Sequence, residues 1–323
     1  MVILMKTMHT TNYKLYNRKT NDEFRICLMN DLHFSEGTTN EKLKMILEKL
    51  EKLEPNYTMI PGDLIDSINV LDDLENKKRL LIWLKEIGQL SKTFVSLGSH
   101  DYCRKHETEK NKLLKWQYDY PYEFFDEVND QPNVHVLNNK SFEDSKIFVT
   151  GYTQSMHYFN PIIDKRKRIF DKNIENKELM LEELKKLRET IINIPKDKVN
   201  FIMVHSPVYL KDYDIEELLK GYDYYISGHM HNGMVPPILN EIWMSNRGII
   251  APSRDLFPKN SRNTFKQKED KLIVNAPLTT FHENHGMFSK FNFLYPSYIS
   301  VIDFSKDIAY ATNKIYTKRY YGK

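Results

Sequence analysis

The chain has little of what a secreted or membrane-spanning protein requires. Its 323 residues include only two cysteines, Cys27 and Cys103, which cannot build a disulfide framework. No run reaches the roughly 20 apolar residues that a transmembrane helix needs, and the apolar start at residues 1–5 is too short for the core of a signal peptide. We therefore expect a cytoplasmic protein, with a peripheral membrane contact as the alternative.

A strong excess of charge of one sign is also absent. The chain carries 47 basic and 44 acidic residues, which gives a formal net charge of +3 at pH 7 and a pI near 8.5. Such a balance creates no strong overall field, so charge alone indicates no nucleic-acid partner. The apolar fraction of 41% is high enough for a sizeable core and excludes a wholly disordered chain.

Apolar runs and helical patterns alternate along most of the chain. Strands are predicted over residues 24–29, 57–61, 93–97, 134–137, 146–151, 200–204, 222–227, 271–274, 298–304 and 308–312. Helices are predicted over residues 40–53, 70–90, 107–116 and 177–192. This alternation predicts one α/β domain over residues 1–323, with two sheets stacked face to face and helices outside. Residues 1–22 are expected to form an N-terminal extension, and residues 233–270 an irregular rim of the cleft.

Five of the predicted strands are followed by short segments rich in metal-ligating side chains. The segments are Asp31-Leu32-His33, residues 62–66 (GDLID), residues 98–101 (GSHD), His205-Ser206-Pro207 and residues 228–231 (GHMH). Open α/β sheets bind their ligands at the carboxyl ends of the strands. Segments far apart in the sequence are therefore expected to converge on one crevice.

The residue types in these segments suit the cleavage of an anionic phosphoester. Two cations ~3.5–4 Å apart can neutralise the ester and lower the pKa of a bound water toward ~7. Asp31 and His33 lie two apart on an expected extended strand end, so both side chains should point to one side and bind one ion. Asp63 can bridge two ions, and Gly62 leaves room for the backbone beside it.

Three histidines complete the candidate ligand set. His229 and His231 repeat the two-residue spacing, and His205 follows a strand of its own. Asp66 is expected to fix its loop by accepting backbone hydrogen bonds, as Asp does in turns. A purely structural zinc site is disfavoured, because such sites favour closed, cysteine-rich ligand sets. These residues favour a metal-dependent enzyme that cleaves phosphoesters.

In order and spacing, the five segments resemble the calcineurin-like metallophosphoesterase superfamily, whose pattern is DxH, GDxxD, GN-H-D/E, H and GHxH. The resemblance covers residues 25–231. It implies a four-layer α/β-β/α sandwich of two mixed sheets with helices outside, and a dinuclear metal centre at the carboxyl ends of the strands. It also implies two divalent ions, manganese first with iron or zinc as alternatives, and a phosphoester substrate. Within the superfamily, the chain is similar to bacterial-type stand-alone phosphoesterases.

The resemblance implies a role for each residue of the candidate site. The implied metal ligands are Asp31, His33 and His231 for the first ion, His205 and His229 for the second, and Asp63 as the bridge. His100 is implied to protonate the leaving-group oxygen, and Asp101 to orient its ring. Ser99 stands where the superfamily places an asparagine amide on the second metal. Its shorter side chain leaves direct ligation, a water-mediated contact and an open coordination position as alternatives.

Other functions remain open from the sequence. A non-catalytic metal-binding or scaffold protein could keep the fold, but His100 and Asp101 favour catalysis because neither is needed to hold metal. A nuclease of the same superfamily would be expected to show a broad basic surface, which the small net charge does not support.

The basic run at residues 165–168 is a candidate contact for an acidic substrate or a membrane surface. Candidate phosphate-binding residues at the rim are Arg247, Arg254, Lys259 and Arg262. The choice between monoester and diester and the oligomeric state stay undecided.

Overall fold

The computed structural model describes most of the chain. The described residues are 8–20, 22–107, 114–155, 172–207, 213–236, 239, 247–250, 256–259, 261–267, 270–280 and 295–305. The strand predicted at residues 308–312, the basic run at residues 165–168 and Arg254 lie outside the described residues.

The strands form two mixed sheets. The first sheet has the order β1 (Met8–Leu15), β14 (Ser297–Phe304), β2 (Phe24–Leu28), β3 (Tyr57–Pro61), β4 (Lys92–Ser96) and β7 (Val134–Val136). The second has the order β12 (Asn263–Gln267), β13 (Asp270–Val274), β11 (Tyr224–Ser227), β10 (Val199–Val204), β9 (Ile147–Tyr152) and β8 (Lys140–Glu143). Antiparallel pairing joins β14 to β2, β12 to β13 and β8 to β9, whereas the other neighbours are parallel.

The central strands are buried on both faces, which explains their continuous apolar runs. Side chains alternate between the faces of a strand. In β2, Ile26 and Leu28 belong to the apolar core between the two sheets, whereas Cys27 belongs to the core under the helices of the first sheet. Aromatic rings join the sheets in the middle layer. Phe201 of β10 stacks on Tyr224 of β11 and meets Phe304 of β14 edge-on, with 5.9 Å between the last two ring centroids.

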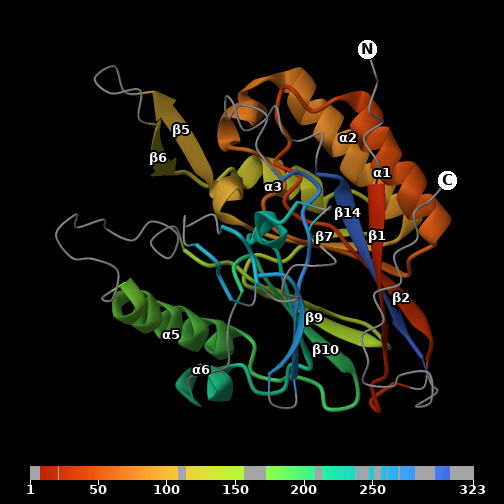
Figure 1. The fold of residues 1–323 in the computed structure, drawn as a ribbon, viewed down its shortest axis with the longest axis vertical. Coiled ribbons are helices and arrows are strands. Elements are labelled where there is room, and N and C mark those ends of the chain that lie inside the picture. Colours follow the sequence, from red (N-terminus) through yellow and green to blue (C-terminus); the bar gives the residue numbers. More distant parts are fainter. Residues whose placement is uncertain are drawn as a thin grey trace.

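Helices cover the outer face of each sheet (Figure 1). The first sheet packs against α1 (Asn40–Leu53), α2 (Leu74–Leu90) and α3 (Tyr122–Asn129), and the second against α5 (Lys172–Thr190) and α6 (Tyr213–Leu218). Short 3-10 turns are η1 (Ile68–Asp72), η2 (Ser99–Tyr102) and η3 (His231–Met234). The predicted α/β-β/α sandwich of two mixed sheets with helices outside is confirmed.

Local capping sets the helix boundaries. The Thr39 side chain accepts a hydrogen bond from the backbone N–H of Lys42 and begins α1 at the predicted residue. The Asp73 side chain accepts from the backbone N–H groups of Glu75 and Asn76 and begins α2. This cap divides the helix predicted at residues 70–90 into η1 and α2, because the capping residue itself is not helical.

One predicted helix is wrong. Residues 103–107 and 114–118 form an antiparallel hairpin of β5 (Cys103–Glu107) and β6 (Leu114–Tyr118) instead of a helix at residues 107–116. In Figure 1 this hairpin extends away from the two main sheets. The local pattern of apolar and charged residues favoured a helix, but pairing between the two strands overrides that weak preference.

The predicted N-terminal extension and the predicted irregular rim both contain strands. The extension predicted at residues 1–22 includes β1, which pairs in parallel with β14 at the edge of the first sheet. The rim predicted at residues 233–270 includes β12, at the edge of the second sheet. Among the described residues, no helix combines the length and apolar character that crossing a bilayer requires.

Candidate metal centre

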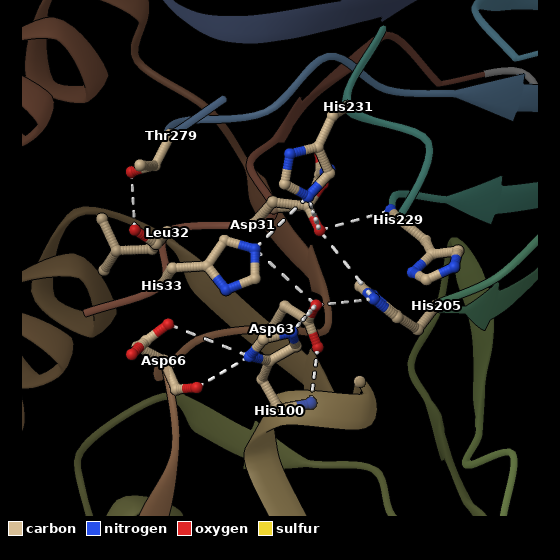
Figure 2. Close-up of polar contacts among 12 residues, drawn as sticks. Asp31, Leu32, His33, Asp63, Asp66, His100, His205, His229, His231 and Thr279 are labelled. Carbon is tan, nitrogen blue, oxygen red and sulfur yellow. Dashed lines mark hydrogen bonds and ion pairs between the residues drawn. The ribbon is translucent and has the colours of Figure 1, made fainter. Parts of the chain in front are cut away.

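Loops at the carboxyl ends of strands from both sheets meet at one site (Figure 2). The loop after β2 carries Asp31 and His33, and the loop after β3 carries Asp63. The second sheet contributes His205 after β10 and the segment with His229 after β11. The structure therefore brings together the side chains that the strand-then-loop pattern selected.

The candidate ligands form two sets with three residues in each. The sets are Asp31, His33 and His231, and Asp63, His205 and His229. Within each set, one ligand atom from every residue lies within 4.8 Å of the others. This grouping agrees with the division between two ions that the sequence resemblance implies.

The carboxylate of Asp63 connects the two sets. Its Oδ2 atom lies 2.9 Å from Nε2 of His205 in its own set and 3.7 Å from Nε2 of His33 in the other. The Asp63 side chain is almost completely buried, so its negative charge requires positive partners at short range. This position suits a carboxylate shared by two cations.

Several ligands have left-handed backbone conformations. The φ angles are 51° at Asp31, 47° at His33, 53° at Asp63, 62° at His229 and 45° at His231. The expectation that Asp31 and His33 lie on an extended strand end is therefore wrong, although both still belong to one ligand set. Such conformations cost non-glycine residues on the order of 1–3 kcal/mol each and persist where the surrounding structure holds them.

Backbone hydrogen bonds hold two of these loops together. The N–H of Asp31 donates to the Gly62 carbonyl at 3.2 Å, and the N–H of His33 donates to the Asp63 carbonyl at 3.1 Å. Gly62 itself has a φ of 91°, and a Cβ at this position would lie 2.7 Å from Nδ1 of His205. The loop after β3 therefore needs glycine before Asp63 for both its conformation and its close contact with a histidine ring.

Backbone carbonyls fix the ring orientation of three histidines. The contacts join Nδ1 of His100 to the Asp66 carbonyl at 2.7 Å, Nδ1 of His205 to the Pro61 carbonyl at 2.9 Å, and Nδ1 of His231 to the Thr280 carbonyl at 2.6 Å. A carbonyl oxygen only accepts, so each Nδ1 must carry a proton. Each Nε2 is then the atom available to a metal ion or to a substrate.

Charges inside the site balance one another. Burial raises the pKa of the Asp31 carboxyl. Burial acts in the same direction on Asp63, but the charges of His205 and His100 outweigh it and hold the pKa of Asp63 far below its usual range. Burial disfavours protonated His205, yet Asp63 outweighs this effect and raises the pKa of His205 to about 9. Burial and the charge of His205 lower the pKa of His229 to about 3, which leaves His229 neutral and able to ligate.

Comparison with known proteins identifies the family. A family model described as calcineurin-like phosphoesterase matches residues 24–233, which is more than half of the chain. The chain belongs to this family. The family prediction made from the five segments is thus confirmed.

Curated relatives of the chain are distant and longer. It is 22% identical over 227 residues to an uncharacterized metallophosphoesterase of Helicobacter pylori, covering 69% of this chain and 48% of the relative. It is 20% identical over 217 residues to an uncharacterized metallophosphoesterase of Campylobacter jejuni, covering 67% of this chain and 46% of that relative. The chain thus spans about half the length of these two curated relatives.

Solved structures of similar proteins are also remote. A dimetal phosphatase from Danio rerio is 11% identical with a TM-score of 0.42, and the match covers 79% of this chain and 87% of that one. The phosphopantetheinyl hydrolase of Mycobacterium tuberculosis is 11% identical with a TM-score of 0.42, covering 81% of this chain and 93% of that one. Similarity at this level says nothing about the substrate of this protein.

The contacts of Asp66 and Asp101 differ from those that the sequence assigned to them. Asp101 accepts backbone hydrogen bonds from Gly98 at 2.8 Å and from Ile65 at 3.1 Å, so it holds these loops, and its role in orienting the His100 ring remains a prediction. Asp66 provides the carbonyl that holds His100, and its carboxylate binds Nζ of Lys105 at 2.5 Å. The reason is local, because the turn of η2 brings the Asp101 side chain back to the amide three residues earlier.

Ser99 lies in the first turn of η2 and is 9% exposed. The neighbouring N–H of His100 donates to Oδ1 of Asp63 at 3.0 Å, so the turn that contains Ser99 touches the shared carboxylate. A ligand role for Ser99 remains a prediction. Of the rim residues, Arg262 is buried, and the Arg247 side chain donates to the Phe257 carbonyl at 3.3 Å.

A segment after β13 supports the site and was missed from the sequence. Asn275 donates from its side-chain amide to Oδ1 of Asn30, and Asn30 donates in turn to Oδ2 of Asp31. The backbone N–H of Thr279 donates to the Asp31 carbonyl at 2.9 Å, and its hydroxyl donates to the Leu32 carbonyl at 2.7 Å (Figure 2). The signal was present, because polar residues follow the strand predicted at residues 271–274 as they follow the other five.

Replacing Asp101 with Asn should test its role in holding the two loops. An amide oxygen can replace one carboxylate oxygen, but the amide nitrogen would face a second N–H donor. We expect Asp101→Asn to lower the free energy of unfolding by about 1–3 kcal/mol, measured by chemical denaturation of the metal-free protein. The control is Asp73→Asn, because Asp73 also accepts two backbone N–H bonds but is an exposed helix cap where Asn is equally suitable. An unchanged stability with a large loss of activity would instead favour a direct role at His100.

Proposed function

We propose that the protein is a metal-dependent hydrolase that cleaves a phosphoester, either a monoester or a diester. The position of Asp63 is the observation that carries this proposal. A buried carboxylate contacts histidines of two separate ligand sets, at 2.9 Å from His205 and 3.7 Å from His33. Membership of the calcineurin-like phosphoesterase family supports the same activity.

The residues present fit two divalent ions. Both sets combine carboxylate oxygen with imidazole nitrogen and contain no thiolate, a donor set suited to manganese, iron or zinc. We propose manganese first. The first ion would be held by Asp31, His33 and His231, the second by His205 and His229, and Asp63 would contact both. When bound, such ions neutralise the ester and make a water molecule acidic enough to attack it near pH 7.

In the proposed reaction, His100 acts on the substrate. Its Nδ1–H donates to the Asp66 carbonyl, and its Nε2 lies 4.0 Å from Oδ2 of Asp63 at the edge of the site. The His100 side chain is 16% exposed, whereas those of His33 and His205 are at most 1% exposed. Protonated His100 can therefore donate its Nε2 proton to the oxygen of a leaving group that arrives from solvent.

The alternatives receive less support from the described residues. A metal-binding scaffold has no need of a partly exposed histidine whose ring is held by a backbone carbonyl beside the ligands. Nothing in the described part of the chain favours nucleic acid over another phosphoester. Contact with a membrane depends on residues 165–168, which lie outside the described part of the chain, and stays a prediction.

Metal loading of an Asp63 variant tests the proposed function. We expect the wild-type protein to hydrolyse p-nitrophenyl phosphate or its diester with manganese and to lose activity when the metal is chelated. Asp63→Asn should abolish hydrolysis and lower the metal content, because a neutral amide cannot offset two dications. Asp72→Asn, an exposed site outside the ligand sets, is the control. Elemental analysis measures the metal content, and the assays with p-nitrophenyl phosphate and its diester measure the hydrolysis. Full metal loading without hydrolysis of any phosphoester by the wild type would identify a scaffold.

The role of His100 predicts a dependence on the leaving group. His100→Ala should keep its metal content and lower kcat by on the order of 10²–10⁴ for phenyl phosphate, whose leaving group needs protonation. The loss should be smaller for p-nitrophenyl phosphate, whose leaving group departs as an anion more readily. Steady-state kinetics and elemental analysis of the same preparations provide the measurement. Loss of metal in proportion to loss of activity would make His100 a ligand and not an acid.

The short side chain of Ser99 predicts that the second metal ion binds weakly. If its hydroxyl is a poor or water-mediated ligand, Asp63, His205 and His229 alone hold the second ion firmly. Ser99→Asn should then tighten that ion by about 10–100-fold, the usual effect of changes to supporting metal interactions. The measurement is a manganese titration of activity in both proteins. An unchanged or weaker midpoint in the variant would show that this loop already accommodates serine.

A further inference from the structure

The first strand of the β5–β6 hairpin brings a lysine to the edge of the metal centre. Nζ of Lys105 lies 2.5 Å from Oδ2 of Asp66, and the two side chains are only 13% and 6% exposed. Most ion pairs on protein surfaces contribute little, because water screens them and the side chains are free to move. This pair is screened much less, and loss of either partner would leave a charge nearly buried.

Asp66 connects this lysine to His100. The Asp66 carbonyl lies 2.7 Å from Nδ1 of His100, and its Oδ1 atom lies 4.0 Å from the same nitrogen (Figure 2). The carboxylate of Asp66 thus has the ammonium of Lys105 on one oxygen and the ring of His100 near the other. A chain of contacts leads from the hairpin to the proposed general acid.

The neighbours of Asp66 indicate where its carboxylate could turn if Lys105 did not hold its Oδ2 atom. Together with His33 and His100, Asp66 forms a third set of ligand atoms that lie within 4.8 Å of one another. A carboxylate released from Lys105 can turn toward Nδ1 of His100 or toward a cation shared with these histidines. Either movement changes the position of the His100 ring, so the ammonium keeps Asp66 in its supporting role.

The backbone of Lys105 is held independently of its side chain. Its N–H donates to Oδ1 of Asn69 at 2.8 Å, and its carbonyl accepts from Nδ2 of Asn69 at 3.2 Å. Arg104 binds Asp72 with both terminal nitrogens and contacts Asp119. The contacts with Asn69 fasten the base of the hairpin to η1, which follows the Asp66 loop in the chain. A substitution of the Lys105 side chain therefore leaves the hairpin attached.

We propose that Lys105 is a positioning residue for His100 and acts through Asp66. This inference rests on the proposed phosphoester hydrolysis. In the proposed role, Lys105 fixes the residue that holds the acid. Its loss should therefore slow the step in which the leaving group is protonated and leave substrate binding nearly unchanged.

The test compares Lys105→Met with two other variants at saturating manganese. Lys105→Met should lower kcat for phenyl phosphate by about 10–100-fold, the range known for outer-shell partners at metal sites, with little change in KM. The loss for p-nitrophenyl phosphate should be several-fold smaller. Lys105→Arg keeps a positive charge and should restore most of the activity. Arg104→Met removes exposed ion pairs at the same hairpin base and should match the wild type on both substrates.

Several outcomes would overturn the proposal. Equal losses on both substrates, or the same losses in Arg104→Met, would show that Lys105 only stabilises the hairpin. Activity of Lys105→Met that returns with more manganese would assign Lys105 to metal retention instead. If Lys105→Met does not fold, Lys105→Gln keeps a hydrogen-bond donor without the charge and must show the same dependence on the leaving group. A wild-type protein that hydrolyses no phosphoester would overturn the proposed function itself, whatever the variants do.

Discussion

The candidate metal centre depends on the electrostatics of one buried carboxylate, that of Asp63. This group lies between the loops of two sheets, with Nε2 of His33, His205 and His100 within 4.0 Å of its Oδ2 atom. A negative charge at this depth is strongly unfavourable unless positive charge surrounds it. In the protein without bound ions, protonated histidine rings can provide that positive charge. Bound divalent ions would provide more of it. The absence of a side chain at Gly62 follows from the same constraint, because the His205 ring must come close to this loop.

The sandwich supplies the rigidity that such a site requires. The apolar layer between the sheets, with Phe201 against Phe304, fixes the carboxyl ends of strands from both sheets. Ligands in left-handed conformations are costly in a free loop. Here the loops after β2 and β3 hydrogen-bond to each other residue by residue, so each restrains the other. The order of the core therefore extends into loops that would otherwise be mobile.

Sequence patterns predicted the layers and the convergence of the candidate ligands because both depend on properties that repeat along the chain. Burial of strands on two faces leaves long apolar runs, and ligands at strand ends leave short polar segments after them. The individual roles of Asp66 and Asp101 could not be predicted, since they depend on which oxygen meets which amide in the folded loops. The β5–β6 hairpin was also missed, because its pairing partner is not visible in a local helical pattern. Asn30 was missed because its amide acts only through contacts with Asp31 and Asn275.

The backbone contacts of the histidines bear on how this site can change during evolution. The carbonyl groups that receive the Nδ1 protons of His205 and His231 belong to Pro61 and Thr280. A carbonyl is present whatever side chain a residue carries, so substitutions at these two positions can leave the tautomer of each ring intact. The path of the main chain thus determines which ring nitrogen each histidine offers to a metal ion. Comparison of homologous sequences would give no sign of this control, because the groups responsible are identical in every amino acid.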